Sequence, residues 1–76
     1  MNVIRMNKKI IKAYNEIVEY NNGIGFVDSK KNIASQVINR LDFETRYQLM
    51  QTVDTEKFKT MQAKINLCTK YILDLI

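Results

Sequence analysis

Residues 3–22 read VIRMNKKIIKAYNEIVEYNN, and this stretch decides the fold because its apolar side chains recur at helical spacing. The steps between them alternate between three and four residues, which returns each side chain to one face of a helix. Asn2 is a suitable N-cap, and Gly23 stands where a left-handed residue often ends a helix. We therefore expect a long helix from about Val3 to Asn22. Its apolar face carries Val3, Met6, Ile10, Ala13, Ile17 and Tyr20.

A different interpretation of this region starts from Asn22 and Gly23, a pair that is typical of tight hairpin turns. The turn would join residues 17–20 and 24–27 as two strands. Neither flank alternates between apolar and polar residues, whereas the helical pattern upstream is long. The helix is therefore favoured.

Three further helical segments follow along the chain. The second begins near Asp28 or Ser29, the third follows Asp42, and the fourth begins at Asp54 or Thr55, each a residue type that caps helices. The sequence thus predicts an all-α fold: a small compact helical bundle of about four helices in a single domain, residues 1–76. Two helices, the N- and C-terminal ones, are long and two are short. We expect the long helices to pack antiparallel and the short ones to cover them.

The two long helices differ in the width of their apolar faces. Helix four carries a narrow seam of about 100°, whereas the apolar arc of helix one is about 200° wide. Either helix one is central and covered on two sides, or its outer flank meets another chain, which leaves a homo-oligomer open. The first interpretation needs no second chain. The seam of helix four is formed by Phe58, Met61, Ile65, Cys68, Ile72 and Leu75, and the outer flank of helix one by Ile4, Ile11 and Val18.

The apolar loop after helix one supplies a second candidate contact. Ile24 and Phe26 stand beside Gly23 and Gly25, and an exposed aromatic ring on a loop is a common anchor for a partner protein. The other interpretation, which we favour, is that Phe26 folds back and plugs the end of the bundle. The candidate partner-binding residues are therefore Ile4, Ile11, Val18, Ile24 and Phe26.

The sequence offers little material for catalysis. It contains no histidine, which excludes the familiar histidine-based triads, and a single thiol cannot build a zinc site. Cys68 falls on the apolar seam of helix four, where a core role is expected. Glu16 and Glu19 share the polar face of helix one, which we expect to be solvated, whereas a catalytic carboxylate needs a desolvated pocket. We expect no enzymatic activity, no catalytic residue, no cofactor and no metal.

The glycines before helix two have a faint likeness to a phosphate cradle. Gly23 and Gly25 precede a helix start at Ser29 that carries lysines. The spacing does not match a P-loop or a dinucleotide fingerprint, and no buried strand precedes the glycines. A helix end, a loop and an ordinary helix start are the favoured interpretation.

The basic side chains suggest an alternative function, nucleic-acid binding. The formal net charge is +4, and a group of cations without acids opens helix one. A basic stripe could follow a phosphate backbone, which makes a nucleic-acid-binding regulator the alternative prediction. Lysines outnumber arginines, whereas base readout relies on arginine, and a helix-turn-helix alignment through Ala34 places Glu44 at a buried aliphatic position. The residues of this alternative are Arg5, Lys8, Lys9, Lys12, Lys30 and Lys31.

The number of cysteines and the hydropathy of the first residues indicate the cellular compartment of the protein. One cysteine fits a reducing environment, and the first residues lack the apolar core of a signal peptide. We expect a cytoplasmic protein, in a bacterium or an infected host cell, without a membrane partner. A membrane-surface role for helix one is opposed by Glu16 and Glu19.

The function predicted from the sequence is a non-enzymatic protein-interaction module that binds a larger protein as an inhibitor, adaptor or regulator. In size and helical content the chain is similar to many small phage-encoded proteins that act on host proteins, such as anti-sigma, anti-restriction and anti-CRISPR factors. That likeness rests on no motif, so it assigns a role to no residue.

Overall fold

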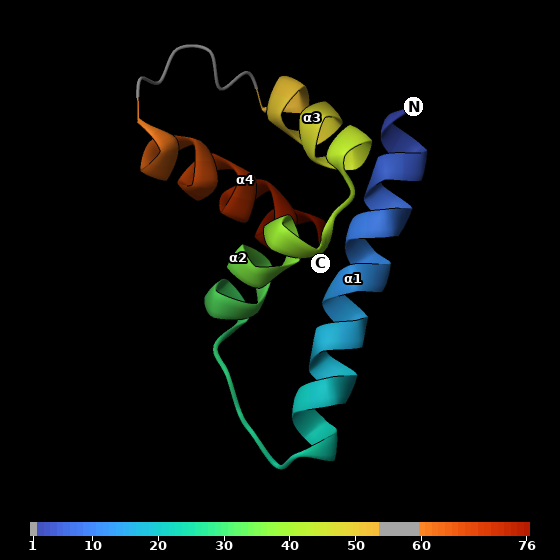
Figure 1. The fold of residues 1–76 in the computed structure, drawn as a ribbon, viewed down its shortest axis with the longest axis vertical. Helices are drawn as coiled ribbons and strands as arrows, with labels where there is room; N and C mark the ends of the chain where they lie inside the picture. Colours follow the sequence, from blue (N-terminus) through green and yellow to red (C-terminus); the bar gives the residue numbers. More distant parts are fainter. Residues whose placement is uncertain (1, 54–59) are drawn as a thin grey trace.

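The computed structural model describes residues 2–53 and 60–76, and these residues form four helices and no strand. The helices are α1 (Val3–Gly23), α2 (Lys30–Arg40), α3 (Phe43–Thr52) and α4 (Met61–Leu75). Figure 1 shows them gathered into one small bundle. The all-α prediction is confirmed, with two longer helices at the ends of the chain and two short ones between them. None of the helices in the described ranges is long and apolar enough to cross a membrane.

A side-chain oxygen caps the start of each helix. The caps are Asn2 for α1, Ser29 for α2, Asp42 for α3 and Thr60 for α4, and each accepts a hydrogen bond from the backbone N–H three residues later. The first three agree with the sequence prediction. The predicted caps of the fourth helix, Asp54 and Thr55, lie outside the described residues, as does Phe58 of its predicted seam. Thr60 has extended backbone geometry, so α4 begins at Met61 and is shorter than expected.

α1 ends one residue later than predicted, and the left-handed residue that follows it is displaced by two. Gly23 is still helical, and the residue with positive φ is Gly25, at 71°. The amide of Phe26 donates to the carbonyl of Asn21 at 2.8 Å, and that of Gly25 donates to Asn22 at 3.2 Å. This pair of bonds is a Schellman motif, which satisfies carbonyls at a helix end. The hairpin interpretation is therefore wrong, because 17–23 are helical.

The helices pack in an order that the sequence did not predict. We expected α1 and α4 to lie antiparallel along their lengths, but α4 packs chiefly against α2 and meets α1 near its own C-terminal end (Figure 1). α2 packs against both α1 and α4, whereas α1 contacts all three other helices. The buried residues of α2 are Ile33, Ala34, Val37 and Ile38.

Polar contacts link the helices at the edges of the core. The hydroxyls of Ser35 and Thr69 lie 3.3 Å apart between α2 and α4. The Tyr71 hydroxyl donates to the Asn7 amide oxygen at 2.8 Å, which ties α4 to α1. Within these contacts lie fully buried apolar side chains from all four helices, among them Met6, Ile10, Ile17, Val37, Leu49, Cys68 and Ile72.

Candidate interaction surface on α1 and the following loop

The outer flank of α1 remains accessible in this chain. Ile4 is 69% exposed and Ile11 is 39% exposed, whereas Val18 is partly buried at the edge of the core. We call these three residues the α1 seam. They are spaced by seven residues, which is nearly two helical turns, so they lie along one side of the helix. The interpretation that α1 is covered on two sides by its own bundle is wrong for Ile4 and Ile11.

The loop between α1 and α2 exposes a second group of apolar side chains, Ile24, Phe26 and Val27, which we call the loop patch. Their exposed fractions are 61%, 51% and 92%. Phe26 is 51% exposed and is not among the residues packed against the core, so the favoured interpretation that it plugs the end of the bundle is wrong; it lines a hollow together with Val18. That hollow, of about 130 Å³, connects the loop patch to the α1 seam. Its lining comprises Val18, Asn21, Asn22, Phe26, Val27, Asp28 and Ile33.

The loop patch is held at both ends by hydrogen bonds. The Schellman motif holds its first residues against the end of α1. Asp28, which follows the loop patch, is tied to the start of α2, because one of its carboxylate oxygens accepts from the Ser29 amide and from the Asn32 side chain, each at 2.9 Å. The other oxygen accepts from the Gln36 side chain at 3.1 Å. The apolar side chains are therefore displayed on an ordered loop.

The basic residues of the alternative function lie in two separate places. Arg5, Lys8 and Lys12 are exposed on α1, and Lys9 forms an ion pair with Asp42 at 3.2 Å. Arg40 joins this group, because Lys9, Lys12 and Arg40 line one hollow of about 270 Å³. The same hollow also contains Glu16 and Asp42, so its charge is mixed.

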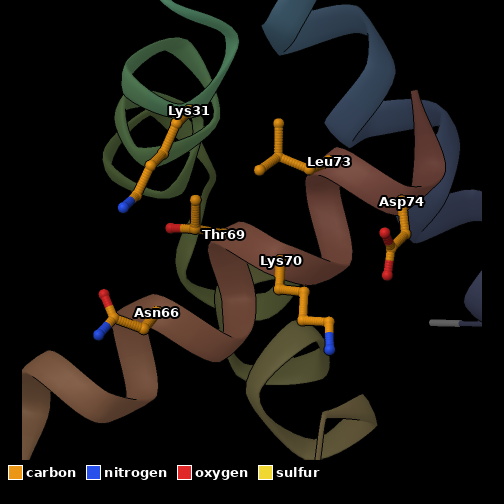
Figure 2. Close-up of a pocket in the computed structure, with 6 residues that line it drawn as sticks. All are labelled: Lys31, Asn66, Thr69, Lys70, Leu73 and Asp74. Atoms are coloured by element: carbon orange, nitrogen blue, oxygen red, sulfur yellow. The ribbon is translucent and has the colours of Figure 1, made fainter.

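The second basic group opens α2, where Lys30 and Lys31 are exposed. Lys31 shares a hollow of about 370 Å³ between α2 and α4 with Lys70 and Asp74. Figure 2 shows the amino groups of Lys31 and Lys70 pointing away from each other. The two cations therefore do not converge on one anion position, and the two basic groups do not form one continuous stripe.

The position of Asp42 at the start of α3 changes the pKa of its carboxyl. Hydrogen bonds from Thr45, followed by one from Lys9, lower the pKa of its exposed carboxyl from 3.8 to about 2. Both kinds of contact favour the ionised form. The charge of Asp42 thus serves the helix cap and the contact between α1 and α3.

The thiol of Cys68 and the carboxylates of Glu16 and Glu19 lie in different surroundings. Cys68 is 1% exposed, and burial raises the pKa of its thiol, so the group stays protonated. Glu16 and Glu19 are exposed on α1. Within 2–53 and 60–76, no three histidine, cysteine, aspartate or glutamate side chains are placed to share a metal ion.

An aromatic pair on α3, Phe43 and Tyr47, is absent from the candidate residues of the sequence analysis. Their rings stack with centroids 6.4 Å apart, and they are 81% and 56% exposed. The core is filled instead by Thr45 and Leu49 on the opposite side of α3. The spacing of four residues could have indicated the stacking, because such neighbours meet on a helix surface.

None of the protein-family models, curated proteins or solved structures compared with the chain matches it.

Proposed function

We propose that this chain is a non-enzymatic protein-interaction module that binds a larger protein through the loop patch and acts as an inhibitor, adaptor or regulator. The proposal rests on one observation. Three large apolar side chains that lie within four residues of the sequence, Ile24, Phe26 and Val27, are exposed together on an ordered loop. Single exposed apolar residues are common on protein surfaces, but an adjacent group of them is typical of an interface.

The loop patch has the physical properties of a binding anchor. Removing apolar surface from water stabilises a complex by about 25 cal/mol for each Å² buried. The hydrogen bonds made by Phe26 and Asp28 order the loop before binding. A partner therefore gains this contact with little loss of loop entropy, which favours affinity. The ring of Phe26 can supply the central contact, as aromatic residues do in many interfaces.

The test places a photo-crosslinking amino acid at Val27, because that side chain is 92% exposed and its replacement leaves the core intact. In cells that produce the chain, we expect one protein to be crosslinked in stoichiometric amounts. Introducing Ile24→Asp into the same chain should abolish that product. A control, Phe43→Asp, changes an apolar residue on α3 that is even more exposed than Ile24 and should leave the crosslinked product unchanged.

Circular dichroism of each variant checks that the helices are retained. Crosslinking that is diffuse, or that survives Ile24→Asp, would refute the loop patch as a binding site.

Nucleic-acid binding is the second candidate, and one observation favours it. Arg40 from α2 adds an arginine to Lys9 and Lys12 from α1. A phosphate-binding face should show affinity for duplex DNA or RNA that falls steeply as salt is raised, because binding releases counterions. Changing Lys8 and Lys12 to Glu should abolish that affinity. Absence of binding near physiological salt would remove this candidate.

A further inference from the structure

We propose that single-stranded nucleic acid binds where α3 meets the N-terminal half of α1, with bases stacked on Phe43 and Tyr47 and phosphates along the basic group of α1. Such binding rests on the nucleic-acid candidate above and narrows it to single strands. It uses a different part of the molecule from the loop patch. Figure 1 shows α3 beside the N-terminal half of α1, whereas the loop between α1 and α2 lies at the opposite end of α1.

The aromatic pair on α3 is accessible and ordered. Phe43 and Tyr47 are 81% and 56% exposed, neither packs against the core, and their ring planes are inclined by only 15°. The Gln51 side-chain amide donates to the Tyr47 hydroxyl at 2.9 Å, which holds that ring in place. Every nucleic-acid base has a flat π-face that can stack on such a ring. Nearly parallel rings therefore suit consecutive bases of one strand.

Cations lie next to the aromatic pair. Phe43 directly follows Asp42, whose carboxylate pairs with Lys9 of α1 at 3.2 Å, so the pair begins beside the basic group of α1. Among the described residues, Lys9 is the one member of that group with an ion pair. The other members are free to meet phosphates. The group consists of Arg5, Lys8, Lys9, Lys12 and Arg40, and all are exposed.

The charge near the start of α3 is positive although acidic residues are present. Glu16 and Asp42 line the hollow that contains Lys9, Lys12 and Arg40, and Glu44 is exposed in the first turn of α3. The cations of the basic group outnumber these carboxylates.

Arg46 of α3 adds another cation. Its guanidinium donates to the backbone carbonyls of Ile38 at 3.2 Å and Leu41 at 3.4 Å, and bonds to uncharged carbonyls leave its positive charge in place. An anionic strand is therefore attracted to this part of the surface.

The position of the cations on α1 does not serve the stability of the helix. Arg5 lies in the first turn, and that turn has no acidic residue. The N-terminus of a helix carries partial positive charge, so a cation there is unfavourable for the helix itself. Positions at which such local preferences are broken are commonly functional. A phosphate bound beside Arg5 would offset the unfavourable charge.

The combination of rings and cations favours a single strand over a duplex. In a duplex the faces of the bases are stacked on one another, so they cannot reach Phe43, whereas a single strand offers both phosphates and base faces. Stacking of this kind tolerates any sequence. That agrees with a chain in which lysines outnumber the arginines that base readout needs.

Fluorescence anisotropy of a labelled oligodeoxythymidine strand of about 20 nucleotides, longer than a typical single-strand site, measures the affinity of the intact chain. A duplex of the same length is the comparison. We expect micromolar affinity for the single strand at low salt, several times tighter than for the duplex. With roughly four phosphate contacts, the logarithm of the affinity should fall with the logarithm of the salt concentration with a slope of about −3.

Phe43→Leu separates stacking from general apolar contact, because it keeps an apolar side chain and removes the ring. It should weaken single-strand binding by about fivefold or more and leave duplex binding unchanged. The matched control, Phe43→Tyr, keeps a ring at this exposed position and should retain the affinity. Phe43→Trp gives the chain its only tryptophan, whose fluorescence should be quenched by stacking as the strand is added.

Arg40→Gln tests the phosphate contacts. It should weaken binding to single strands of every sequence and make the salt slope shallower by about 0.7, because one phosphate contact is lost. Lys70→Gln on α4 is the matched control, because it removes the same charge from the hollow between α2 and α4 and should leave the affinity unchanged. Circular dichroism checks that each variant retains its helices.

Three results would overturn the proposal. Equal affinity for single strand and duplex, both unaffected by Phe43→Leu, would exclude stacking but leave the nucleic-acid candidate in place. Absence of binding to either at low salt would remove both. Loss of the protein crosslink at Val27 in Phe43→Leu, with single-strand affinity unchanged, would assign the aromatic pair to the protein interface instead.

Discussion

Two adjacent isoleucines on α1 provide the sharpest test of how this chain folds. Ile10 and Ile11 follow each other in the sequence and are chemically identical. In the structure, Ile10 is 0% exposed within the core, whereas Ile11 is 39% exposed on the α1 seam. We predict that Ile10→Ala destabilises the protein far more than Ile11→Ala does, although both changes remove the same atoms from the same helix.

The expected difference follows from what each side chain touches. Ile10→Ala removes three buried carbon atoms, each worth about 0.8 kcal/mol of transfer free energy. The cavity left in a packed core adds roughly 1 kcal/mol, so the loss is about 3.5 kcal/mol. At Ile11 water can occupy the vacated space and no cavity remains. The loss there should be about 1 kcal/mol or less.

Urea unfolding followed by circular dichroism measures both losses, at a concentration low enough to keep the chain monomeric. A protein of 76 residues is expected to have a free energy of unfolding of about 4 to 11 kcal/mol. Ile10→Ala should therefore remove a large share of it and lower the urea midpoint by roughly 3 M. Equal losses for the two variants would mean that Ile11 is as buried as Ile10, which would refute the α1 seam as an accessible surface.

Three further predictions concern a carboxylate, a thiol and two glycines. The pKa of Asp42 is about 2 in the fold and 3.8 when unperturbed, so its stabilising effect is present above about pH 4 and is lost as the pH falls toward 2. Thermal melts across that range should show a smaller acid-induced loss for Asp42→Asn, and an equal loss would contradict the role of the contacts with Lys9 and its own cap. Cys68 should resist a thiol reagent in the folded protein and react after urea is added, and rapid reaction in the folded state would show that the thiol is not buried. Gly25→Ala should destabilise the fold by about 1 kcal/mol because of the positive φ, whereas Gly23→Ala should be neutral or slightly stabilising because its helical backbone suits alanine and nothing lies within 4 Å of the added methyl. Urea midpoints compare the stability of the two variants. A larger loss of stability for Gly23→Ala than for Gly25→Ala would contradict the assignment of Gly25 as the left-handed residue.

Local patterns in the sequence were sufficient to predict the helices. The alternation of three- and four-residue steps located α1, the caps at Asn2 and Asp42 located two helix starts, and the pair Asp28 and Ser29 located a third to within one residue. Cys68 was correctly predicted to be buried, because it lies on the apolar face of its helix. These features depend on residues within a few positions of each other, and an isolated sequence contains that information in full.

The tertiary structure decided which apolar faces are covered. The sequence showed that α1 has a wide apolar face, but only the packing of the other helices against it determined that Ile10 is buried and Ile11 is exposed. In the same way, the packing buries Leu49 and leaves Phe43 of the same helix exposed. Packing of this kind depends on the directions in which whole helices cross, which local spacing does not specify. The α1 seam and the loop patch are therefore products of the packing, although every residue in them is part of a pattern visible in the sequence.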